Sequence, residues 1–462
     1  MLSIRHGSTR PRQSSFASVH SLPYELLAIT FRFCFLNHRF MKRLTCAPPC
    51  PDEAPLLLMR VCRKWRECAI STPSLWSRIS LGRKSRTKIS PSLLNIKINE
   101  WLDRAGSVPL CIDVYYETYH DKSKQTAGDA ALLDIFAASR RWNSVSLEVN
   151  IPSRAPCVDF ILDAVLKHSP MLERFEIYFN ANNPSWVVGS PMKPIEIGDN
   201  HRLTSFKIDT THPNPFRLCL PTVKFHNIQH LHLKWPETND NCLEILDRCP
   251  QVEVLHVAIG RQSQLSITTT ILRMEKLHTF SIFSASDECV AGFLDGISTP
   301  ALTAFTMHSV SLGPPRGPSK SHWPHLSQLF ARSQSPLTDC ELLRSPMLED
   351  DIIKCLQHIP ALTILSGDEY LLMDKVLEAL TPTVNAEDML CPALTTVMFR
   401  GIHNDLNNTT PTTYRQWRFA QEISNKDVVN VGSVAAEAIE GRQTILTRRV
   451  WCERMRECMK RR

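Results

Sequence analysis

The sequence predicts an α/β protein: a small all-α helical module followed by an irregular solenoid, with parallel strands inside and helices outside. Three observations lead to this fold class. Residues 21–81 carry two apolar stripes at helical spacing, a short apolar pattern at strand spacing recurs beyond residue 140, and prolines stand at a constant offset before many copies of that pattern. The spacing of apolar positions distinguishes the two kinds of element, because side chains repeat once per turn in a helix and alternate in a strand.

The first predicted helix opens at Pro23, whose missing N–H costs nothing in a first helical turn. Ser21 precedes it as an N-cap, and Glu25 adds negative charge where the helix dipole favours it. Apolar residues then follow at steps of four, three and four, on one helical face: Leu22, Leu26, Ile29 and Phe33. Leu27 and Phe31 widen that face.

A second helix repeats this spacing and stops before Pro73; its apolar residues are Leu57, Val61, Trp65 and Ala69. Between the two helices, residues 41–55 form a proline-rich loop inserted into the module. On periodicity alone, an ordinary helical hairpin core explains these residues. The order of the residue types says more.

That order resembles the F-box, whose usual form runs Leu-Pro-x-Glu-Leu-Leu, then Val-Cys-x-x-Trp, then Pro-x-Leu-Trp. The matching residues are Leu22, Pro23, Glu25, Leu26, Leu27, Val61, Cys62, Trp65, Pro73, Leu75 and Trp76. The match covers about 60 of the 462 residues. It departs from the family at Thr30, where isoleucine is frequent, and in the insertion at 41–55.

The resemblance implies that the module binds a Skp-family adaptor and, through it, a cullin-based ubiquitin ligase. An F-box protein performs no catalysis; it holds a substrate near a ubiquitin-loaded enzyme and contributes effective concentration and orientation. The residues expected to contact the adaptor are Leu22, Pro23, Glu25, Leu26, Leu27, Ile29, Phe31, Leu57, Val61, Cys62 and Trp65.

Beyond residue 140 the pattern apolar-x-x-apolar-x-apolar recurs, with the copy at Leu362 keeping only its first two apolar positions. The copies begin at Trp142, Leu172, Leu203, Ile228, Val252, Leu277, Leu302, Leu337, Leu362 and Leu394. From Leu203 to Leu302 the step from one copy to the next is nearly constant, a regularity that scattered apolar residues do not produce. The last two apolar residues alternate at period two, as a short buried strand requires.

Helical segments at 160–170, 241–250 and 351–360 separate these strands, and each ends in a proline two positions before the next copy. Proline restricts the residue before it to extended geometry, so it divides helix from strand. This strand-plus-helix unit resembles a leucine-rich repeat, a frequent companion of the F-box in large fungal families. That repeat normally holds Asn or Cys at position nine. Here, of the copies compared, only the one with Asn180 does, which predicts an irregular solenoid.

In such a solenoid the third and fifth residues of each copy face the concave side. These columns place Arg174 and Glu176 on one strand, His230 and His232 on another, and His256 on the next. We predict these five residues as substrate contacts, because concave faces are where solenoids usually bind. The histidines also fit a metal or pH-sensitive site, or ordinary exposed polar residues. No carboxylate or cysteine shares the adjacent columns, so no metal site is predicted.

Composition indicates a folded chain, with 43% hydrophobic and 21% charged residues. No apolar run reaches the length of about 18 residues that a membrane span needs. The N-terminal segment at 1–20 lacks the apolar core of a signal peptide. Its arginines and serines also fit a transit peptide, but N-terminal disorder is the interpretation we favour. The expected location is the cytoplasm, the nucleus or both.

Sixteen cysteines are spread along the chain without the spacing of a disulfide framework, which favours reduced, mostly buried thiols. Cys46 and Cys50, with His38 and Cys62 nearby, are the one arrangement that suggests a zinc loop. No second closely spaced pair supports that site, so neither a metal nor another cofactor is predicted.

The net charge of +7 comes mostly from residues 441–462, where eight basic and two acidic residues give +6 and leave +1 for the rest. This tail is the one candidate for contact with nucleic acid or acidic lipid, or for nuclear import; a solvated helix end is the plainer explanation. The chain contains no Walker-type loop, nucleophile elbow, zinc-protease pair or dinucleotide fingerprint. An enzyme is therefore not predicted.

The predicted organisation has five parts: a disordered 1–20, the F-box-like module at 21–81, a connector with first repeat elements at 82–140, the solenoid at 141–401, and a C-terminal segment at 402–462. The predicted function is substrate recruitment to a Skp–cullin–F-box ubiquitin ligase. The alternative is a non-catalytic repeat scaffold that takes no part in ubiquitination.

Overall fold

The structure is a computed structural model, and it divides into two compact units that we describe separately. Unit 1 comprises residues 1–115 and 119–141, and unit 2 comprises 116–118 and 142–462. The described residues are 21–33, 53–81, 91–117, 137–150, 165–180, 195–198, 202–210, 218–219, 224–234, 236, 238–260, 270–284, 287–309, 322–368, 371, 374–380, 390–400, 414–419 and 445–446. The predictions for 1–20, for most of the 41–55 loop and for most of the basic tail lie outside these residues.

Unit 1 begins with the two predicted helices, α1 (Tyr24–Phe33) and α2 (Arg63–Ile70), with the 3-10 turn η2 (Leu58–Arg60) between them. A second 3-10 turn, η3 (Pro73–Leu75), leads into β1 (Arg78–Leu81), which pairs in parallel with β2 (Leu110–Glu117). Helix α3 (Pro91–Ala105) connects the two strands, and the turn η4 (Ser139–Arg141) closes the unit. The core of unit 1 therefore mixes the helical module with a strand–helix–strand element.

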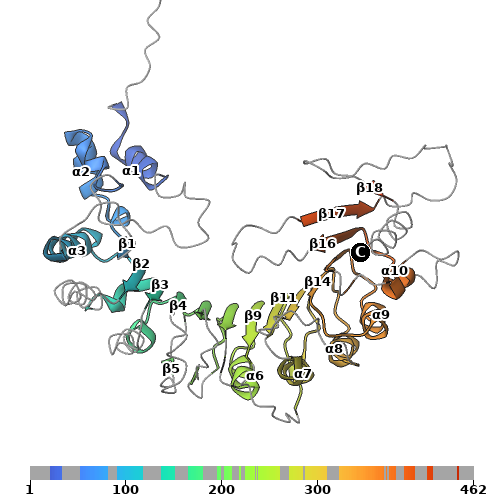
Figure 1. The fold of residues 1–462 in the computed structure, drawn as a ribbon. Coiled ribbons are helices and arrows are strands. Elements are labelled where there is room, and N and C mark those ends of the chain that lie inside the picture. Colours follow the sequence, from blue (N-terminus) through green and yellow to red (C-terminus); the bar gives the residue numbers. More distant parts are fainter. Residues whose placement is uncertain are drawn as a thin grey trace, which may run out of the picture. The chain divides into compact units, whose positions relative to one another are not determined.

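Unit 2 is built on a sheet whose strands follow one another in chain order (Figure 1). The strands are β3 (Trp142–Asn150), β4 (Arg174–Asn180), β6 (Ser205–Thr210), β8 (His230–Lys234), β9 (Val254–Ile259), β11 (Thr279–Ser284), β13 (Ala304–Ser309), β14 (Asp339–Leu343), β15 (Ile364–Gly367) and β16 (Thr396–Arg400). All pair in parallel. β17 (Tyr414–Phe419) then joins β16 antiparallel, and β18 (Ile445–Leu446) pairs with β17.

Helices cover one face of this sheet (Figure 1). They are α6 (Asn239–Arg248), α7 (Asp287–Asp295), α8 (His325–Ser333), α9 (Glu349–Gln357) and α10 (Asp374–Leu380). Two short pairs of strands, β5 (Ile195–Glu196) with β7 (Leu218–Cys219) and β10 (Leu272–Arg273) with β12 (Ile297–Ser298), complete the unit. The predicted α/β repeat solenoid, with parallel strands on one side and helices on the other, is confirmed.

The apolar positions of the repeated pattern form the core between sheet and helices. Phe280 and Phe305 pack ring to ring at 5.4 Å on adjacent strands, and Phe305 also meets Phe330 of α8 at 5.5 Å. All three side chains are buried. Such aromatic pairs contribute about 0.5–1.5 kcal/mol beyond the area they bury.

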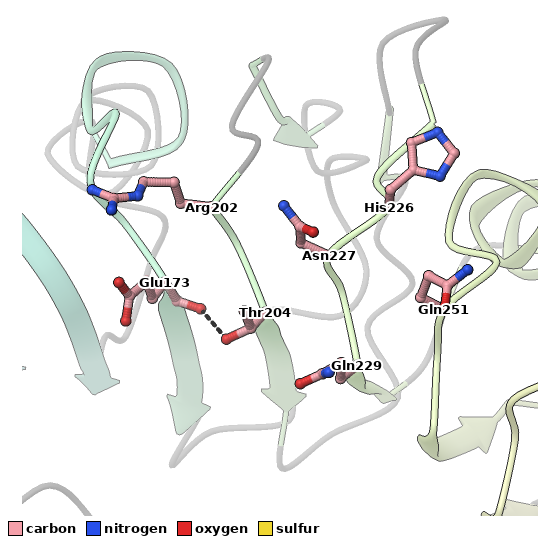
Figure 2. A pocket seen from close by; sticks show the side chains of 7 residues that line it. All are labelled: Glu173, Arg202, Thr204, His226, Asn227, Gln229 and Gln251. Atoms are coloured by element: carbon pink, nitrogen blue, oxygen red, sulfur yellow. Dashed lines mark hydrogen bonds between the residues drawn. The ribbon is translucent and has the colours of Figure 1, made fainter.

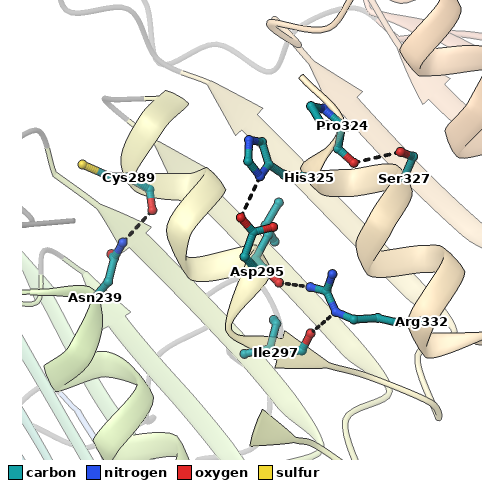
Figure 3. Close-up of polar contacts among 9 residues, drawn as sticks. Asn239, Cys289, Asp295, Ile297, Pro324, His325, Ser327 and Arg332 are labelled. Atoms are coloured by element: carbon teal, nitrogen blue, oxygen red, sulfur yellow. Dashed lines mark hydrogen bonds and ion pairs between the residues drawn. The ribbon is translucent and has the colours of Figure 1, made fainter. Parts of the chain in front are cut away.

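Hydrogen bonds across the outer layer join successive helices (Figure 3). The Asn239 side-chain amide on α6 donates to the Cys289 carbonyl of α7 at 2.7 Å, and His325 of α8 lies 2.8 Å from the Asp295 carboxylate. Arg332 of α8 donates to the carbonyls of Leu294 and Ile297. The two Arg332 contacts satisfy backbone carbonyls at the end of α7 and just beyond it.

A ladder of threonine side chains joins successive repeats. A threonine just before each of several strands donates its hydroxyl to a backbone carbonyl of the preceding repeat. The donors are Thr204, Thr303, Thr338, Thr363 and Thr395, with distances of 2.8–3.1 Å. The ladder keeps successive repeats in register at the edge where the strands begin.

We expect Thr363→Val to lower the free energy of unfolding by about 1 kcal/mol, because one net hydrogen bond is lost. Thr306→Val is the matched control, since Thr306 is half-buried on the sheet face opposite the helices and lies outside the ladder. Urea unfolding followed by circular dichroism measures both. Equal stability of the two variants would show that the ladder bonds contribute nothing.

The cysteines in the described residues are all free thiols, and most are buried. Burial raises the pKa of Cys242 and of Cys249 to about 12. These thiols stay protonated and unreactive at neutral pH, as expected of cysteines that serve as small core residues.

Candidate interaction surfaces

Helix α1 has two apolar faces, and one of them is left exposed. Leu27 and Phe31 are each 1% exposed and form the core of the helical module. Leu26, Ile29 and Phe33 lie on the other side and are 49%, 47% and 58% exposed. Their spacing of three and four positions makes them one stripe along the helix.

Several contacts fix α1 on α2. The Phe31 ring meets the Trp65 ring at 4.9 Å, and the Lys64 ammonium donates to the Leu22 carbonyl at 2.8 Å. The Tyr24 hydroxyl donates to the Glu67 carboxylate at 3.1 Å. Hydrogen bonds from Arg63 and Tyr24 lower the pKa of Glu67. The exposed stripe of α1 is thus held on a packed hairpin.

Cys62 begins α2 as its N-cap. Its backbone is extended, and its sulfur accepts a hydrogen bond from the Trp65 N–H at 3.4 Å. This bond satisfies one of the N–H donors that the start of a helix leaves unpaired. Thr30 is the residue that departs from the family pattern. Its hydroxyl donates to the Leu26 carbonyl at 2.8 Å, and α1 extends through this position to Phe33.

Exposed apolar side chains concentrate in the helical module. Of the large apolar residues exposed in the part of the chain that the structure describes, seven belong to this module: Tyr24, Leu26, Ile29, Phe33, Leu57, Val61 and Ile70. The remaining three are Ile271, Phe283 and Leu348 in unit 2. Exposed apolar patches on folded domains commonly mark interaction sites.

The structure distributes the expected adaptor contacts between surface and core. Leu26, Ile29, Leu57 and Val61 are exposed apolar residues. Pro23 and Glu25 are also exposed, whereas Leu22, Cys62 and Trp65 are half-buried. Leu27 and Phe31 are buried inside the module. Tyr24, Phe33 and Ile70 are exposed apolar residues absent from the expected set; Phe33 shares the helical face of Leu26 and was detectable from spacing.

The predicted histidine cluster forms on the inner face of unit 2, which we define as the sheet face away from α6–α9. His232 and His256 are paired in register on β8 and β9, with ring centroids 5.6 Å apart. His230 lies two positions before His232 and is exposed. Arg174 and Glu176 lie on β4, and the strand register places Glu176 beside Lys207 and Lys207 beside His232. The five predicted residues therefore share one face.

A polar network that sequence reasoning missed surrounds the histidines. The Asp209 carboxylate lies 3.0 Å from the Lys234 ammonium and 3.9 Å from both the Lys207 ammonium and His232 Nε2. The Lys207 ammonium lies 4.7 Å from the centroid of the Tyr178 ring, and the Tyr178 hydroxyl donates to Glu176 at 2.7 Å. Tyr178, Asp209 and Lys234 occupy the seventh position of their copies. The sequence carries a signal for these three residues, because the alternation of side chains continues along each strand beyond the end of the repeated apolar pattern.

Burial and, to a lesser extent, the neighbouring Lys207 charge lower the pKa of His232 to about 3, against the opposing effect of Asp209. Burial also lowers the pKa of His256. Both imidazoles are neutral at physiological pH. They offer hydrogen bonds to a partner without adding positive charge.

Stability is expected to depend on this neutral state. In the unfolded chain a histidine binds a proton near pH 6.5, whereas folded His232 does not until about pH 3. The unfolded state therefore binds more protons between these values, and stability falls as the pH drops from 6.5, by at most about 1.4 kcal/mol per pH unit for one group. His232→Gln should flatten the dependence of the unfolding free energy on pH between 6.5 and 4.5. Exposed His230→Gln is the control, and identical slopes for both variants would contradict this.

A polar pocket of about 310 Å³ lies at the edge where the strands begin (Figure 2). Its lining residues precede β4, β6, β8 and β9: Glu173, Arg202, Thr204, His226, Asn227, Gln229 and Gln251. The Thr204 hydroxyl within it belongs to the threonine ladder. The lining combines the Glu173 carboxylate, the Arg202 guanidinium, the His226 imidazole and several amides, and Figure 2 shows Glu173 and His226 at opposite ends of the pocket.

Within the described ranges, no group of three or more histidine, cysteine or acidic side chains is arranged to hold a metal ion. No helix in the same ranges is both long and apolar enough to cross a membrane. The apolar stripe of the module and the polar inner face of unit 2 are two candidate interaction surfaces on the described residues.

Comparison with known proteins identifies no family: no family model matches the chain, and no curated protein matches it.

Proposed function

We propose that this chain is a substrate-recruiting F-box subunit of a Skp–cullin–F-box ubiquitin ligase. The helical module docks on a Skp-family adaptor, and the inner face of unit 2 binds a protein substrate. The observation that carries the proposal is the exposed apolar stripe of Leu26, Ile29 and Phe33 on a helix whose opposite face already fills the module's core.

This surface can supply the apolar contribution to a protein interface. Full burial of a Val, Leu, Ile or Phe side chain is worth about 1.5–3 kcal/mol. Five anchors that are about half exposed would therefore supply about 4–7 kcal/mol on docking, before the cost of association. These anchors are Leu26, Ile29, Phe33, Leu57 and Val61. A few such anchors usually dominate a protein–protein interface.

The two surfaces lie on different units, which fits a recruiting role. The apolar stripe belongs to unit 1 and the polar network to unit 2. A protein that binds an adaptor and a substrate through separate surfaces raises the effective concentration of the substrate at the ligase. The inner-face network of lysine, aspartate, tyrosine and neutral histidines supplies hydrogen-bond donors and acceptors for a protein partner.

Co-expression with a Skp-family adaptor tests the proposal. The full-length chain should co-purify with the adaptor through gel filtration at 1:1 stoichiometry. Its depletion in cells should lengthen the half-life of at least one protein that binds the inner face. Stable ligand complexes without adaptor binding, and without any change in ligand turnover, would instead support the non-catalytic scaffold.

A further inference from the structure

Two ring pairs lie on neighbouring rows of the inner face in unit 2. His232 and His256 form one pair on β8 and β9. Phe283 and His308 form the other on β11 and β13, with centroids 5.8 Å apart. Phe283 and His308 are partners in the strand register, one row beyond His256. We call these four side chains the ring track. It crosses four successive strands of the sheet.

Phe283 is an apolar strand residue whose side chain is exposed, and this exposure does not stabilise the fold. It is 38% exposed, and among the large apolar residues exposed in the described ranges it is the one carried by a strand. Its register neighbour on β9, Ala258, is small and buried, so it does not cover the Phe283 ring. An exposed aromatic ring beside an imidazole is a typical anchor point for an apolar side chain of a partner.

The charges on either side of the ring track differ in sign. On the β6–β8 side, Lys207 and Lys234 face the single carboxylate of Asp209. On the far side, β14 presents the carboxylates of Asp339 and Glu341. The inner-face positions of β9, β11, β13 and β14 hold no lysine or arginine.

Asp339 is the less satisfied of the two acids. Burial raises the pKa of its carboxyl group, and no basic group counteracts that effect. Within the part of the chain that the structure describes, no hydrogen bond or ion pair reaches this carboxylate. A half-buried carboxylate without a cation gains from a ligand that brings one, because partly desolvated charges are costly unless paired.

We propose that the inner face between β8 and β14 binds an extended polypeptide segment that carries an acidic, an apolar and a basic side chain in sequence. The acidic side chain meets Lys234 and the histidines, the apolar side chain packs on Phe283 and His308, and the basic side chain meets Asp339 and Glu341. The inference builds on the proposed function, since it names the class of substrate that unit 2 selects.

Strand spacing sets the separation of the three side chains. Adjacent strands are about 4.8 Å apart, and β8, β9, β11, β13 and β14 are neighbours in that order. Lys234 and Phe283 are therefore about 10 Å apart across two steps, and Phe283 and Glu341 are separated by two further steps. A segment in the extended polyproline II conformation rises about 3.1 Å per residue and has three residues per turn, so side chains three residues apart point to the same side and match this spacing.

Fluorescence anisotropy with synthetic peptides and the full-length chain tests this. The probe contains Glu-Gly-Ser-Phe-Ser-Gly-Lys between flexible ends, and the control peptide has the same composition with Lys moved next to Glu. We expect the probe to bind at least about tenfold more tightly than the control peptide. Phe283→Ala and Asp339→Lys should each weaken binding of the probe about fivefold or more, whereas Ile271→Ala should not.

A charge swap sharpens the test. Asp339→Lys should regain affinity for a probe whose Lys is replaced by Glu. Equal binding of probe and control, unchanged binding by Phe283→Ala, or displacement of the probe by a single-stranded oligonucleotide would each overturn the inference. Peptide binding without adaptor binding would refute the proposed ligase role and leave this inference intact. Adaptor binding without spacing-dependent peptide binding would support the proposed ligase role and overturn this inference.

Discussion

Replacing Leu26 and Ile29 with aspartate is expected to weaken binding of a Skp-family adaptor by at least about a hundredfold, or roughly 2.7 kcal/mol. Both side chains are about half exposed on the stripe of α1, so the double variant places two carboxylates where an apolar partner surface would cover them. Desolvating an unpaired carboxylate costs more than the apolar contacts it replaces. Calorimetric titration with the purified adaptor measures the change.

The matched control is Ile271→Asp, which introduces the same charge at a 58% exposed apolar residue of unit 2. This variant should bind the adaptor as the wild type does. Circular dichroism and thermal unfolding establish that both variants are folded, which we expect because none of the three substituted side chains is buried in the core. A folded double variant with wild-type affinity would exclude the α1 stripe as the docking surface.

Trp76→Ala is expected to lower the free energy of unfolding of unit 1 by about 3–5 kcal/mol, the cost of removing a large aromatic side chain from a core. The Trp76 side chain is fully buried, and its indole N–H donates to the Ala69 carbonyl at 2.8 Å. Its ring packs edge-on against Trp101 at 5.0 Å, and the Arg104 guanidinium lies 4.5 Å from it. Trp76 thus ties the end of the helical module to α3.

Trp76→Phe separates packing from hydrogen bonding. It keeps an aromatic ring and loses the indole donor, so its loss should be clearly smaller than that of the alanine variant. Urea unfolding, followed by circular dichroism and intrinsic tryptophan fluorescence, gives both values. A loss below about 1 kcal/mol for Trp76→Ala would show that the ring does not hold unit 1 together.

Much of the fold followed from period and spacing. The nearly constant step between copies of the apolar pattern located the strands, and the predicted columns from Ser205 through His230 to Val254 match the strand register. The helices at 241–250 and 351–360 correspond to α6 and α9. Alternation fixes which side of a strand is buried, so a repeated pattern aligns neighbouring strands without knowledge of the connections.

Only part of the candidate site could be predicted from the period and spacing of the apolar residues. Helix α1 is apolar on two sides, and periodicity alone does not say which side its own module buries. Leu27 and Phe31 face inward because Trp65 of α2 packs there, a tertiary contact between positions far apart in the sequence. The threonine ladder was missed because the family pattern directs attention to position nine, whereas Thr204 and its equivalents lie at position two.

The stacking of Lys207 on Tyr178 was missed for another reason. It joins positions five and seven of adjacent copies, and the repeated apolar pattern stops before the seventh. The ring pair of Phe283 and His308 also lies at this seventh position. The length of each strand depends on its pairing with both neighbours. The inner-face residues beyond the end of the repeated pattern were therefore not predicted.

Isothermal titration calorimetry of the full-length chain with a purified adaptor is the sharpest test of whether the helical module docks on a Skp-family adaptor through its exposed apolar stripe. We predict 1:1 binding with a negative heat-capacity change, the signature of apolar burial, and loss of that signal in the Leu26→Asp, Ile29→Asp double variant. Docking through this stripe would be contradicted if the folded wild-type chain showed no binding at an adaptor concentration of about 100 μM. That result would mean a binding free energy weaker than about −5.5 kcal/mol.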